Sequence, residues 1–415
     1  MKRGSHTSKS RWLMITLVFF ATVINYLDRQ TLSVVAPLVM DQFHMSNRAY
    51  SRIIFAFMLA YTIMNGVSGP LIDRLGTRLG YALTAAWWSA SAMLHGLATG
   101  PWSLGVYRFL LGMGEAGNWP AGVKVVAEWF PVEERALASG LFNLGASIGA
   151  ISAPPLVAWI VLKFGWREAF MSVGLAGFVW LFVWLLVYYT PEEDHAERRA
   201  SPFSVVQLLK LRFVWALTLS KIFFDPAWYF YIFWFPAYLK QARHFDLESI
   251  GKYAWIPFFV AGGGYLLGGW LVAVLLRRGI SLTIARKGTV TVFAVLMTAA
   301  IPAVLVTNVH LSIALVSLAM FGYTGSGANT LAMPADVFSK EMVASVWGLA
   351  GLGSGVGGMA FALMTGWLVD RYSFVPAFVV FGVIPIVSVL ILWCFLGPLE
   401  PLSASPMRSG AMTAC

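Results

Sequence analysis

Twelve apolar stretches of about 20 residues follow one another along this sequence. As a helix, each is long enough to cross a hydrocarbon layer roughly 30 Å thick. Hydrophobic residues make up 59% of the 415 residues and charged residues only 12%. A water-soluble protein of this size needs more polar residues than this to cover its surface. We therefore predict an all-α integral membrane protein and exclude a soluble enzyme, a nucleic-acid-binding protein and a disordered chain. The predicted spans are 12–38, 51–72, 79–98, 102–127, 136–161, 169–189, 213–239, 251–276, 288–306, 311–336, 343–368 and 374–396.

Lys and Arg are distributed unevenly between the two sides of these spans. An even number of spans places both termini on one side, and that side carries about twice as many Lys and Arg residues as the other, which marks it as cytoplasmic. The most polar internal stretch, 190–201, separates six spans from six. We predict a cytoplasmic N-tail at 1–11, an N-terminal half at 12–189, a cytoplasmic central loop at 190–212, a C-terminal half at 213–396 and a cytoplasmic C-tail at 397–415.

The second half of the chain repeats the first. When one half is laid on the other without gaps, the matching residues include Gly145 with Gly353, Phe130 with Phe338, and Trp159 with Trp367. Two parallel six-helix repeats are typical of secondary transporters, whose binding site lies near the midplane between the halves. The match fails at Arg108 and Glu115, so the ionisable residues of that span belong to the first half alone.

Six ionisable residues lie deep inside predicted spans, where a charge costs at least about 2.5–3.5 kcal/mol on insertion scales. Arg108 and Glu115 are almost two helical turns apart, so both project from one face of the span 102–127. Each needs a partner elsewhere, and the span 12–38 offers Asp28 and Arg29, one of each sign. Such a group can exchange protons as its surroundings change, and the alternative is a static ion-pair cluster that locks the two spans together.

The other two of the six, Lys221 and Asp225, have the spacing of an ion pair on one helical turn before Pro226. This pair either serves function or only stabilises an interrupted helix. An aromatic run follows it; most of its rings must pack, but one or two, with Trp228 our candidate, could stack on a substrate. Near the end of the span 102–127, Lys124 and Glu128 have the same spacing, which indicates a pair that reaches the membrane interface.

The histidines lie in tails, loops or span ends, and the sequence has no phosphate-binding loop and no Cys/His spacing typical of a metal site. We therefore predict no enzyme activity, no metal site and no cofactor, so that any coupling ion is a proton.

The loop Gly69-Pro-Leu-Ile-Asp73-Arg74-Leu-Gly76-Thr-Arg78 resembles the Gly-x-x-x-Asp-Arg-x-Gly-x-Arg loop of the major facilitator superfamily. The resemblance implies the fold of that superfamily, with twelve helices in two six-helix repeats. It also implies a cytoplasmic latch at a helix end, formed by Gly69, Asp73, Arg74, Gly76 and Arg78. In the counterpart loop of the second half, Ala273 stands where related sequences usually carry Asp, which implies a weaker second latch.

Finer features resemble the anion:cation symporter branch, which includes bacterial galactonate and hexuronate transporters and vesicular glutamate transporters. The features are Asn25-Tyr-Leu-Asp28-Arg29, Glu128-Trp-Phe-Pro131 and the aromatic string from Asp225 to Pro236, which is most similar to hexuronate transporters. The resemblance implies that Asp28 and Glu115 carry protons and that Arg29, Tyr61 and Arg108 bind the substrate carboxylate. Some galactonate-type members have Gln near the position of Ala146, so substrate hydroxyls would here contact Asn143, Ser147 or Asn329.

These observations lead to one prediction with three alternatives. We predict a proton-coupled symporter in the bacterial inner membrane that imports a small carboxylate by alternating access. The expected substrate is a sugar acid, either a hexuronate or an aldonate, and the protein is expected to function as a monomer in the bilayer, with no nucleic-acid partner. The alternatives are a symporter of another carboxylate such as an aromatic acid, a drug-exporting antiporter, and a sugar-acid sensor that does not transport. Exporters usually carry Gly-x-x-x-Gly-Pro in the fifth span, whereas here Gly149 is followed by Ala150.

Overall fold

The computed structural model describes residues 8–131, 134–189, 205–338 and 340–400, and all regular secondary structure in these ranges is helical. Most of the predicted tails and central loop lies outside them. The helices of the first half are α1 Ser8–Gln42, α2 Asn47–Leu75, α3 Thr77–His95, α4 Pro101–Glu115, α5 Asn118–Trp129, α6 Arg135–Phe164 and α7 Trp166–Val187. Those that follow are α8 Val205–Leu208, α9 Arg212–Arg243, α10 Leu247–Tyr253, α11 Ile256–Arg277, α12 Leu282–Leu296, η2 Met297–Ala299, α13 Ala300–Leu305, α14 Val309–Val337, α15 Lys340–Arg371 and α16 Phe374–Phe395.

Every predicted span is helical, and nine helical segments of the described chain are long and apolar enough to cross a membrane. The three predicted spans outside that set are α3, α4 with α5, and α9. The last two of these hold the ionisable residues Arg108, Glu115, Lys221 and Asp225, which lower their hydropathy. The three polar segments can still be helical because the apolar helices around them supply a buried environment.

Three predicted spans are interrupted where a proline removes a backbone hydrogen bond. The span 102–127 divides into α4 and α5 because Pro120 has no N–H to donate to the carbonyl of Ala116, four residues earlier. Pro257 separates α10 from α11 in the same way, and Pro302 follows the short 3-10 turn between α12 and α13. The break after α4 comes directly after Glu115, so this carboxylate stands at the end of a helix.

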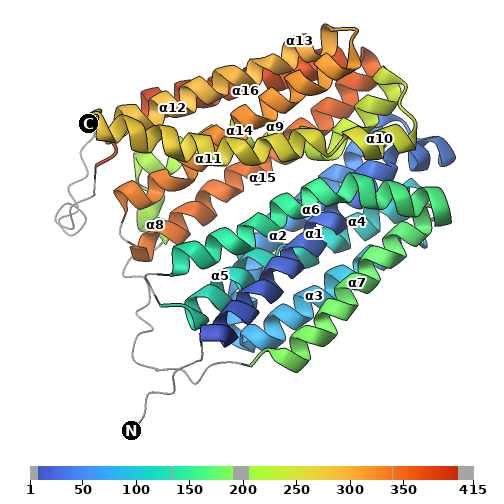
Figure 1. Cartoon of the computed structure of the whole chain (residues 1–415), viewed down its shortest axis with the longest axis horizontal. Coiled ribbons are helices and arrows are strands. Elements are labelled where there is room, and N and C mark those ends of the chain that lie inside the picture. Colours follow the sequence, from blue (N-terminus) through green and yellow to red (C-terminus); the bar gives the residue numbers. More distant parts are fainter. Residues whose placement is uncertain (1–7, 132–133, 190–204, 339, 401–415) are drawn as a thin grey trace.

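The helices form two groups that lie side by side, α1 to α7 and α9 to α16 (Figure 1). The groups meet where α2 packs on α15, where α1 packs on α9, and where α6 packs on α10 and α11. In Figure 1 the ribbons of the two groups diverge toward the side where both termini lie.

Glycines confirm the internal repeat, because matched glycines allow matched close approaches. A Cβ atom added to Gly145 of α6 would lie 2.6 Å from the carbonyl oxygen of Phe19 in α1, so no larger residue fits there. A Cβ atom added to Gly353 of α15 would lie 2.1 Å from the carbonyl oxygen of Thr218 in α9. Helices in lipid commonly pack through small residues that let their backbones touch, because the hydrophobic effect does not drive helices together in an apolar solvent.

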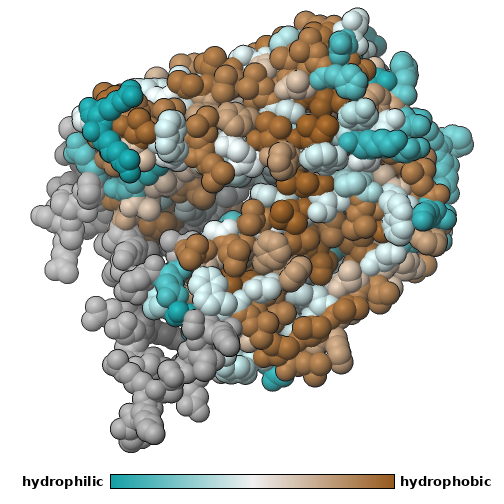
Figure 2. Space-filling model, in the orientation of Figure 1, coloured by the Kyte–Doolittle hydropathy of each residue, from teal (hydrophilic) through white to brown (hydrophobic). Residues whose placement is uncertain are grey.

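The surface is that of a membrane protein. Figure 2 shows apolar residues spread over the flanks of the helices and hydrophilic residues gathered near the ends. Large apolar side chains such as Phe182, Leu186 and Leu266 are 64%, 69% and 78% exposed, which requires lipid rather than water as their surroundings.

The two groups are joined by polar contacts at the ends of the helices farthest from the termini. Oδ1 and Oδ2 of Asp370, at the end of α15, accept hydrogen bonds from the backbone N–H groups of Asn47 (2.9 Å) and Arg48 (2.8 Å), which begin α2. The hydroxyl of Tyr50 donates to the carbonyl oxygen of Phe233 at 2.9 Å. Among the described residues, the hydrogen bonds and ion pairs that we find between the two groups involve residues 47–50. The structure is therefore closed at this end.

Candidate functional site

Arg29 and Glu115 form a buried ion pair between α1 and α4. Nε of Arg29 lies 2.8 Å from Oε2 of Glu115, and the two side chains are 5% and 0% exposed. The second carboxylate oxygen of Glu115 and one terminal nitrogen of Arg29 have no hydrogen-bond partner among the described residues. Each member of the pair therefore keeps hydrogen-bonding capacity for a further group.

Arg108 reaches α1 from the same face of α4, but it does not bind a side chain there. Its terminal nitrogens donate to the backbone carbonyl oxygens of Asp28, at 3.4 Å, and of Arg29. Its Nε has no partner among the described residues. The sequence suggested that the two acids and two arginines would form two ion pairs, and the structure forms one of them. Arg108 contacts the backbone of α1, and the carboxylate of Asp28 forms no hydrogen bond or ion pair with it or with any other described residue.

Asp28 is 1% exposed, and neither oxygen of its carboxylate has a hydrogen-bond partner among the described residues. The same holds for the side-chain amide of Asn25 and for Nε2 of Gln30. A buried polar group without a partner costs free energy, so such groups in native proteins usually have a functional explanation. One face of α1 thus presents several unsatisfied donors and acceptors beside two guanidinium groups.

Aromatic rings surround the two guanidinium groups. Carbon Cζ of Arg29 lies 4.7 Å from the ring centroid of Tyr61 and 5.0 Å from that of Tyr26. The ring of Phe57 lies 5.3 Å from Arg29 and 5.0 Å from Arg108, so it separates the two cations. Ring faces stabilise cations and hold the planar guanidinium groups in fixed orientations. The surroundings of the two guanidinium groups are therefore largely aromatic, with polar groups that converge from α1 and α4.

The two predicted amide contacts lie in different surroundings. Asn143 is exposed on α6, and its Nδ2 donates to the carbonyl oxygen of Ser139 at 2.7 Å. Its side-chain oxygen stays available to another donor.

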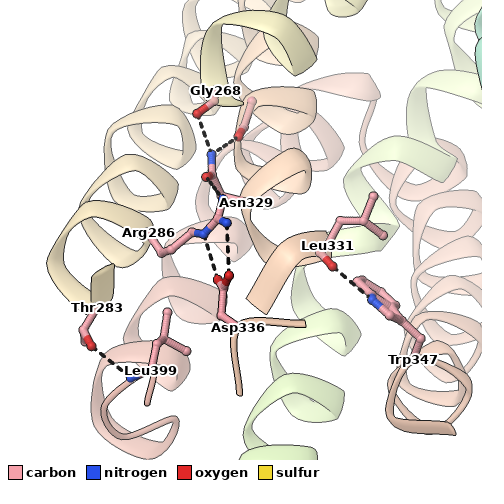
Figure 3. A network of polar contacts seen from close by, with 9 residues as sticks. Gly268, Thr283, Arg286, Asn329, Leu331, Asp336, Trp347 and Leu399 are labelled. Atoms are coloured by element: carbon pink, nitrogen blue, oxygen red, sulfur yellow. Dashed lines mark hydrogen bonds and ion pairs between the residues drawn. The ribbon is translucent and has the colours of Figure 1, made fainter. Parts of the chain in front are cut away.

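Asn329 of α14 is fully buried in a polar network near the end of its helix (Figure 3). Its Nδ2 donates to the carbonyl oxygens of Gly268 and Gly325, each at 3.0 Å, and its Oδ1 accepts from Arg286 at 3.1 Å. Nε of Arg286 also pairs with Oδ2 of Asp336 at 2.9 Å. The amide of Asn329 therefore braces α11, α12 and α14, and the structure does not bring it together with Arg29 and Glu115.

Trp228 and the Lys221–Asp225 pair lie on α9, in the second group of helices. Nζ of Lys221 lies 2.7 Å from Oδ2 of Asp225, as the spacing predicted. Trp228 stacks on Tyr323 of α14, with ring centroids 5.2 Å apart. The helix remains continuous through Pro226, so the pair does not mark a break.

Comparison with known proteins identifies the fold. A sequence model of the Major Facilitator Superfamily matches residues 18–328. The chain belongs to the major facilitator superfamily. It is therefore a multi-pass membrane protein of a family of transporters, not enzymes.

Within the superfamily, the chain is similar to transporters of sugar acids. It is 36% identical to the hexuronate transporter of Escherichia coli (strain K12), over 93% of this chain and 94% of that one. It is 37% identical to the galacturonate transporter of Dickeya chrysanthemi, over 69% and 89% of the two chains. It is 27% identical to the D-galactonate transporter of Escherichia coli O6:H1, over 92% and 94%.

A solved structure shares the fold of this superfamily member. It is a bacterial homolog of the human lysosomal transporter Spinster, in an inward-facing and unoccupied conformation. The TM-score is 0.74 at 18% identity, over 93% of this chain and 95% of that one.

The signature loop of the superfamily lies between α2 and α3, at the end where the termini lie. Gly76 has φ +79°, a conformation that side chains other than glycine rarely adopt, so this position requires glycine. Oδ1 of Asp73 lies 2.8 Å from Nζ of Lys124, and Arg78 donates to the carbonyl oxygen of Leu185 at 2.6 Å. Of the other loop residues, Arg74 is exposed and a Cβ atom on Gly69 would meet no atom within 4 Å.

One predicted pair of this region is wrong. Lys124 does not pair with Glu128, because Asp73 offers Lys124 a carboxylate from another helix. Glu128 instead accepts hydrogen bonds from Thr77 at 2.5 Å and from Tyr188 at 2.7 Å. The three contacts all lie within the first group of helices, so in this structure the loop does not bind the second group.

Several residues of the site were missed by sequence reasoning. Tyr26 and Phe57 hold the guanidinium groups, and Asp370 closes the far end. Tyr26 is one turn before Gln30 and three residues before Arg29, a spacing that could have placed it on the charged face. No comparable signal marks Asp370, because its partners are backbone groups that are present at every position.

Proposed function

We propose that this protein is a proton-coupled symporter that imports a sugar acid, a hexuronate or an aldonate, by alternating access. Arg29 and Arg108 bind the substrate carboxylate, with Tyr61 beside them. Glu115 and Asp28 carry the protons. The similarity to sugar-acid transporters over nearly the whole chain supports the substrate class, and the buried charges on α1 and α4 support the coupling.

The contact between Arg29 and Glu115 is the single observation that carries this proposal. A guanidinium group binds one carboxylate with two parallel hydrogen bonds, and here Glu115 already occupies Nε of Arg29. A substrate carboxylate must compete with Glu115 for the same cation. A proton on Glu115 removes its negative charge and frees Arg29 for the substrate. Substrate and proton then bind together, which is the requirement for symport.

The proposal includes the direction of transport and the placement in the cell. The protein lies in the bacterial inner membrane as a monomer with both termini in the cytoplasm, so the end sealed by Asp370 faces the periplasm. The described conformation is then open to the cytoplasm. The excess of Lys and Arg on the side of the termini supports this orientation. Fusions to the C-terminus test this orientation. A fluorescent protein that stays dark there, together with an alkaline phosphatase that is active there, would place the C-terminus in the periplasm and contradict the orientation.

Transport by the purified protein tests the mechanism. We expect proteoliposomes with an alkaline interior to accumulate labelled D-galacturonate above its external concentration, and a protonophore to abolish the accumulation. Unlabelled glucuronate, galactonate and galactarate should compete strongly, whereas benzoate, which has a carboxylate but no hydroxyls, should compete only weakly. Uptake that only equilibrates, independent of the pH gradient, contradicts symport. Uptake of benzoate in preference to every sugar acid would replace the substrate class with an aromatic acid.

A further inference from the structure

The Lys221–Asp225 pair is a largely buried ion pair that the proposed carboxylate and proton chemistry does not use. Both side chains are largely buried, with 15% and 8% exposed. Replacing such a pair by apolar residues of similar size is often neutral or stabilising, so stability is a weak reason for its presence. Because α9 continues unbroken through this region, the pair is not needed to join two helix fragments.

Neighbouring side chains hold the carboxylate of Asp225 in one orientation. Oδ2 binds Lys221, and Oδ1 accepts a hydrogen bond from the hydroxyl of Tyr323 at 3.1 Å. The ring of Tyr323 lies between the rings of Phe224 and Trp228, nearly parallel to both, with centroid distances of 4.7 Å and 5.2 Å. A carboxylate has about four acceptor positions, so two remain for other donors.

Lys221 is fixed from its other side as well. Its Nζ lies 4.7 Å from the ring centroid of Trp347 in α15. The ammonium group therefore lies between the carboxylate of Asp225 and the ring face of Trp347, and this position orients Asp225. Lys221, Trp228 and Tyr323 are only half-buried, so this face of α9 and α14 is not sealed inside the second group of helices.

The helix that carries this cluster packs against α1, and a series of rings links it to the guanidinium groups. The ring of Phe57, beside Arg29, lies 6.0 Å from that of Phe233 in α9, and Phe233 stacks on Tyr229 at 6.3 Å. The phenol of Tyr229, which follows Trp228, hydrogen-bonds Ser354 of α15 at 3.1 Å. The carboxylate of Asp225 and the guanidinium of Arg29 thus lie on the two sides of one region, between the two groups of helices.

The chemistry of a sugar acid fits this arrangement. Such a molecule has a carboxylate at one end and hydroxyl groups on neighbouring carbon atoms. Two neighbouring hydroxyls donate two hydrogen bonds to one carboxylate, which has the free acceptor positions for them. The apolar face of a sugar packs well against an aromatic ring such as that of Trp228.

We propose that Asp225 is a specificity-determining residue that accepts hydrogen bonds from the hydroxyl groups of the bound sugar acid. Lys221 and Tyr323 are positioning residues that act through Asp225. This inference rests on the proposed function, because it assigns the two ends of one substrate to the two groups of helices. Arg29 and Arg108 bind the carboxylate, whereas Asp225 distinguishes a hydroxylated acid from a plain one.

The test compares two ligands on the full-length protein in proteoliposomes. Inhibition of galacturonate counterflow is measured with unlabelled D-galacturonate and with cyclohexanecarboxylate, which has a carboxylate and a ring but no hydroxyls. For Asp225→Asn we expect the affinity for galacturonate to fall at least about tenfold, or about 1.4 kcal/mol, and that for cyclohexanecarboxylate to change less than about twofold. Tyr323→Phe removes one orienting hydrogen bond and should lower the galacturonate affinity about threefold, again selectively.

A matched control is available on α10. Glu248 and Lys252 form an ion pair of the same spacing at 2.5 Å, but with both side chains more than half exposed. Glu248→Gln should leave both affinities unchanged, so an effect of Asp225→Asn is not a general effect of breaking such a pair. Asp225→Glu keeps the carboxylate and should recover part of the selectivity.

The outcomes separate this inference from the proposed function. If the unmodified protein neither binds nor transports sugar acids, both fail. If it transports galacturonate and Asp225→Asn keeps the wild-type ratio of the two affinities, the role of Asp225 alone is overturned. An equal loss for both ligands in Asp225→Asn and in Tyr323→Phe, with less folded protein, also overturns it, because the pair is then only structural.

Discussion

Nε of Arg29 lies 2.8 Å from Oε2 of Glu115, and this contact joins α1 to α4 at the point where α4 ends. The two residues are 86 positions apart in the sequence, with α2 and α3 between them. Because they pair, a change of charge at Glu115 directly alters the interactions of the guanidinium group that is proposed to bind substrate. The first prediction concerns this link.

Glu115→Gln removes the charge at position 115 but keeps its size and hydrogen-bonding groups. We expect the variant to bind substrate and to exchange labelled for unlabelled substrate across the membrane, because the loaded protein resembles the protonated state. It should fail to accumulate substrate under a pH gradient, since it has no proton to release. Counterflow and gradient-driven uptake on one preparation measure the two properties.

Glu128→Gln is the control for this substitution. Glu128 also lies in a buried polar setting of the same region, with Thr77 and Tyr188 as partners, but it does not contact Arg29. It should retain accumulation. Should Glu115→Gln still accumulate substrate, the proton is carried elsewhere, and Asp28 is the next residue to test.

Arg108→Lys keeps the positive charge but loses the planar fork of the guanidinium group. We expect substrate affinity to fall at least roughly tenfold, about 1.4 kcal/mol. A single ammonium nitrogen also has to replace the two terminal nitrogens of Arg108 that bind separate backbone carbonyl groups of α1. Isothermal calorimetry on the purified protein measures the affinity, with the exposed Arg48→Lys as control. Equal affinities in the two variants would remove Arg108 from the binding site.

Asp370→Ala should open the sealed end of the protein. The substitution leaves the N–H groups of Asn47 and Arg48 without their acceptor and removes a negative charge from the positive end of the α2 dipole. The described conformation should therefore lose population. The labelling rate of a cysteine at position 51 by a membrane-impermeant reagent should increase, in a background without native cysteines.

Asp73→Asn should act at the opposite end. In the described conformation Asp73 is exposed, and its carboxylate pairs with Lys124 of its own group of helices and, among the residues that the structure describes, with no residue of the second group, so its loss costs this state little. If the loop latches the other access state, as in the superfamily, Asp73→Asn should favour the described state and slow transport. Substrate affinity should change less than in Arg108→Lys. Unchanged labelling from both sides of the membrane would exclude a latch.

Gly268→Val tests the packing of α11 on α14. A Cβ atom at Gly268 would lie 2.5 Å from the carbonyl oxygen of Gly325, so the helices must separate. Overpacking of this kind costs typically about 1–3 kcal/mol. We expect a lower melting temperature in detergent, whereas Gly262→Ala, which has open space, should melt like the wild type. Equal melting temperatures of Gly268→Val and the wild type would show that the contact between α11 and α14 is not tightly packed.

The helices could be predicted from sequence because hydropathy over 20 residues is a strong signal. The interruptions were harder to predict, since Pro120 breaks a span whereas Pro226 lies in an unbroken helix. A missing N–H at either place can be compensated by neighbouring helices, and only the packing decides whether the helix stops.

The candidate site was predictable where charge balance alone determined the partner. Arg29 and Glu115 are opposite charges in apolar spans, so each needed the other. Lys124 shows the limit of such reasoning, because two acids were within reach and the local spacing favoured the wrong one. The amide of Asn329 shows a second limit: its partner Arg286 lies on another helix, and nothing in the spacing of the two reveals the contact.

The closure by Asp370 has a consequence for how this protein tolerates change. Its carboxylate binds the backbone of Asn47 and Arg48, and every amino acid except proline supplies the same N–H group. Substitutions at these two positions therefore keep the backbone part of the closure and lose only the ion pair of Arg48 with Asp370 and the hydrogen bond from Gln241 to Asn47, whereas loss of the acid removes both backbone contacts. A library of substitutions at position 48 should consequently retain transport in all members but proline, whereas a library at position 370 should retain it in few.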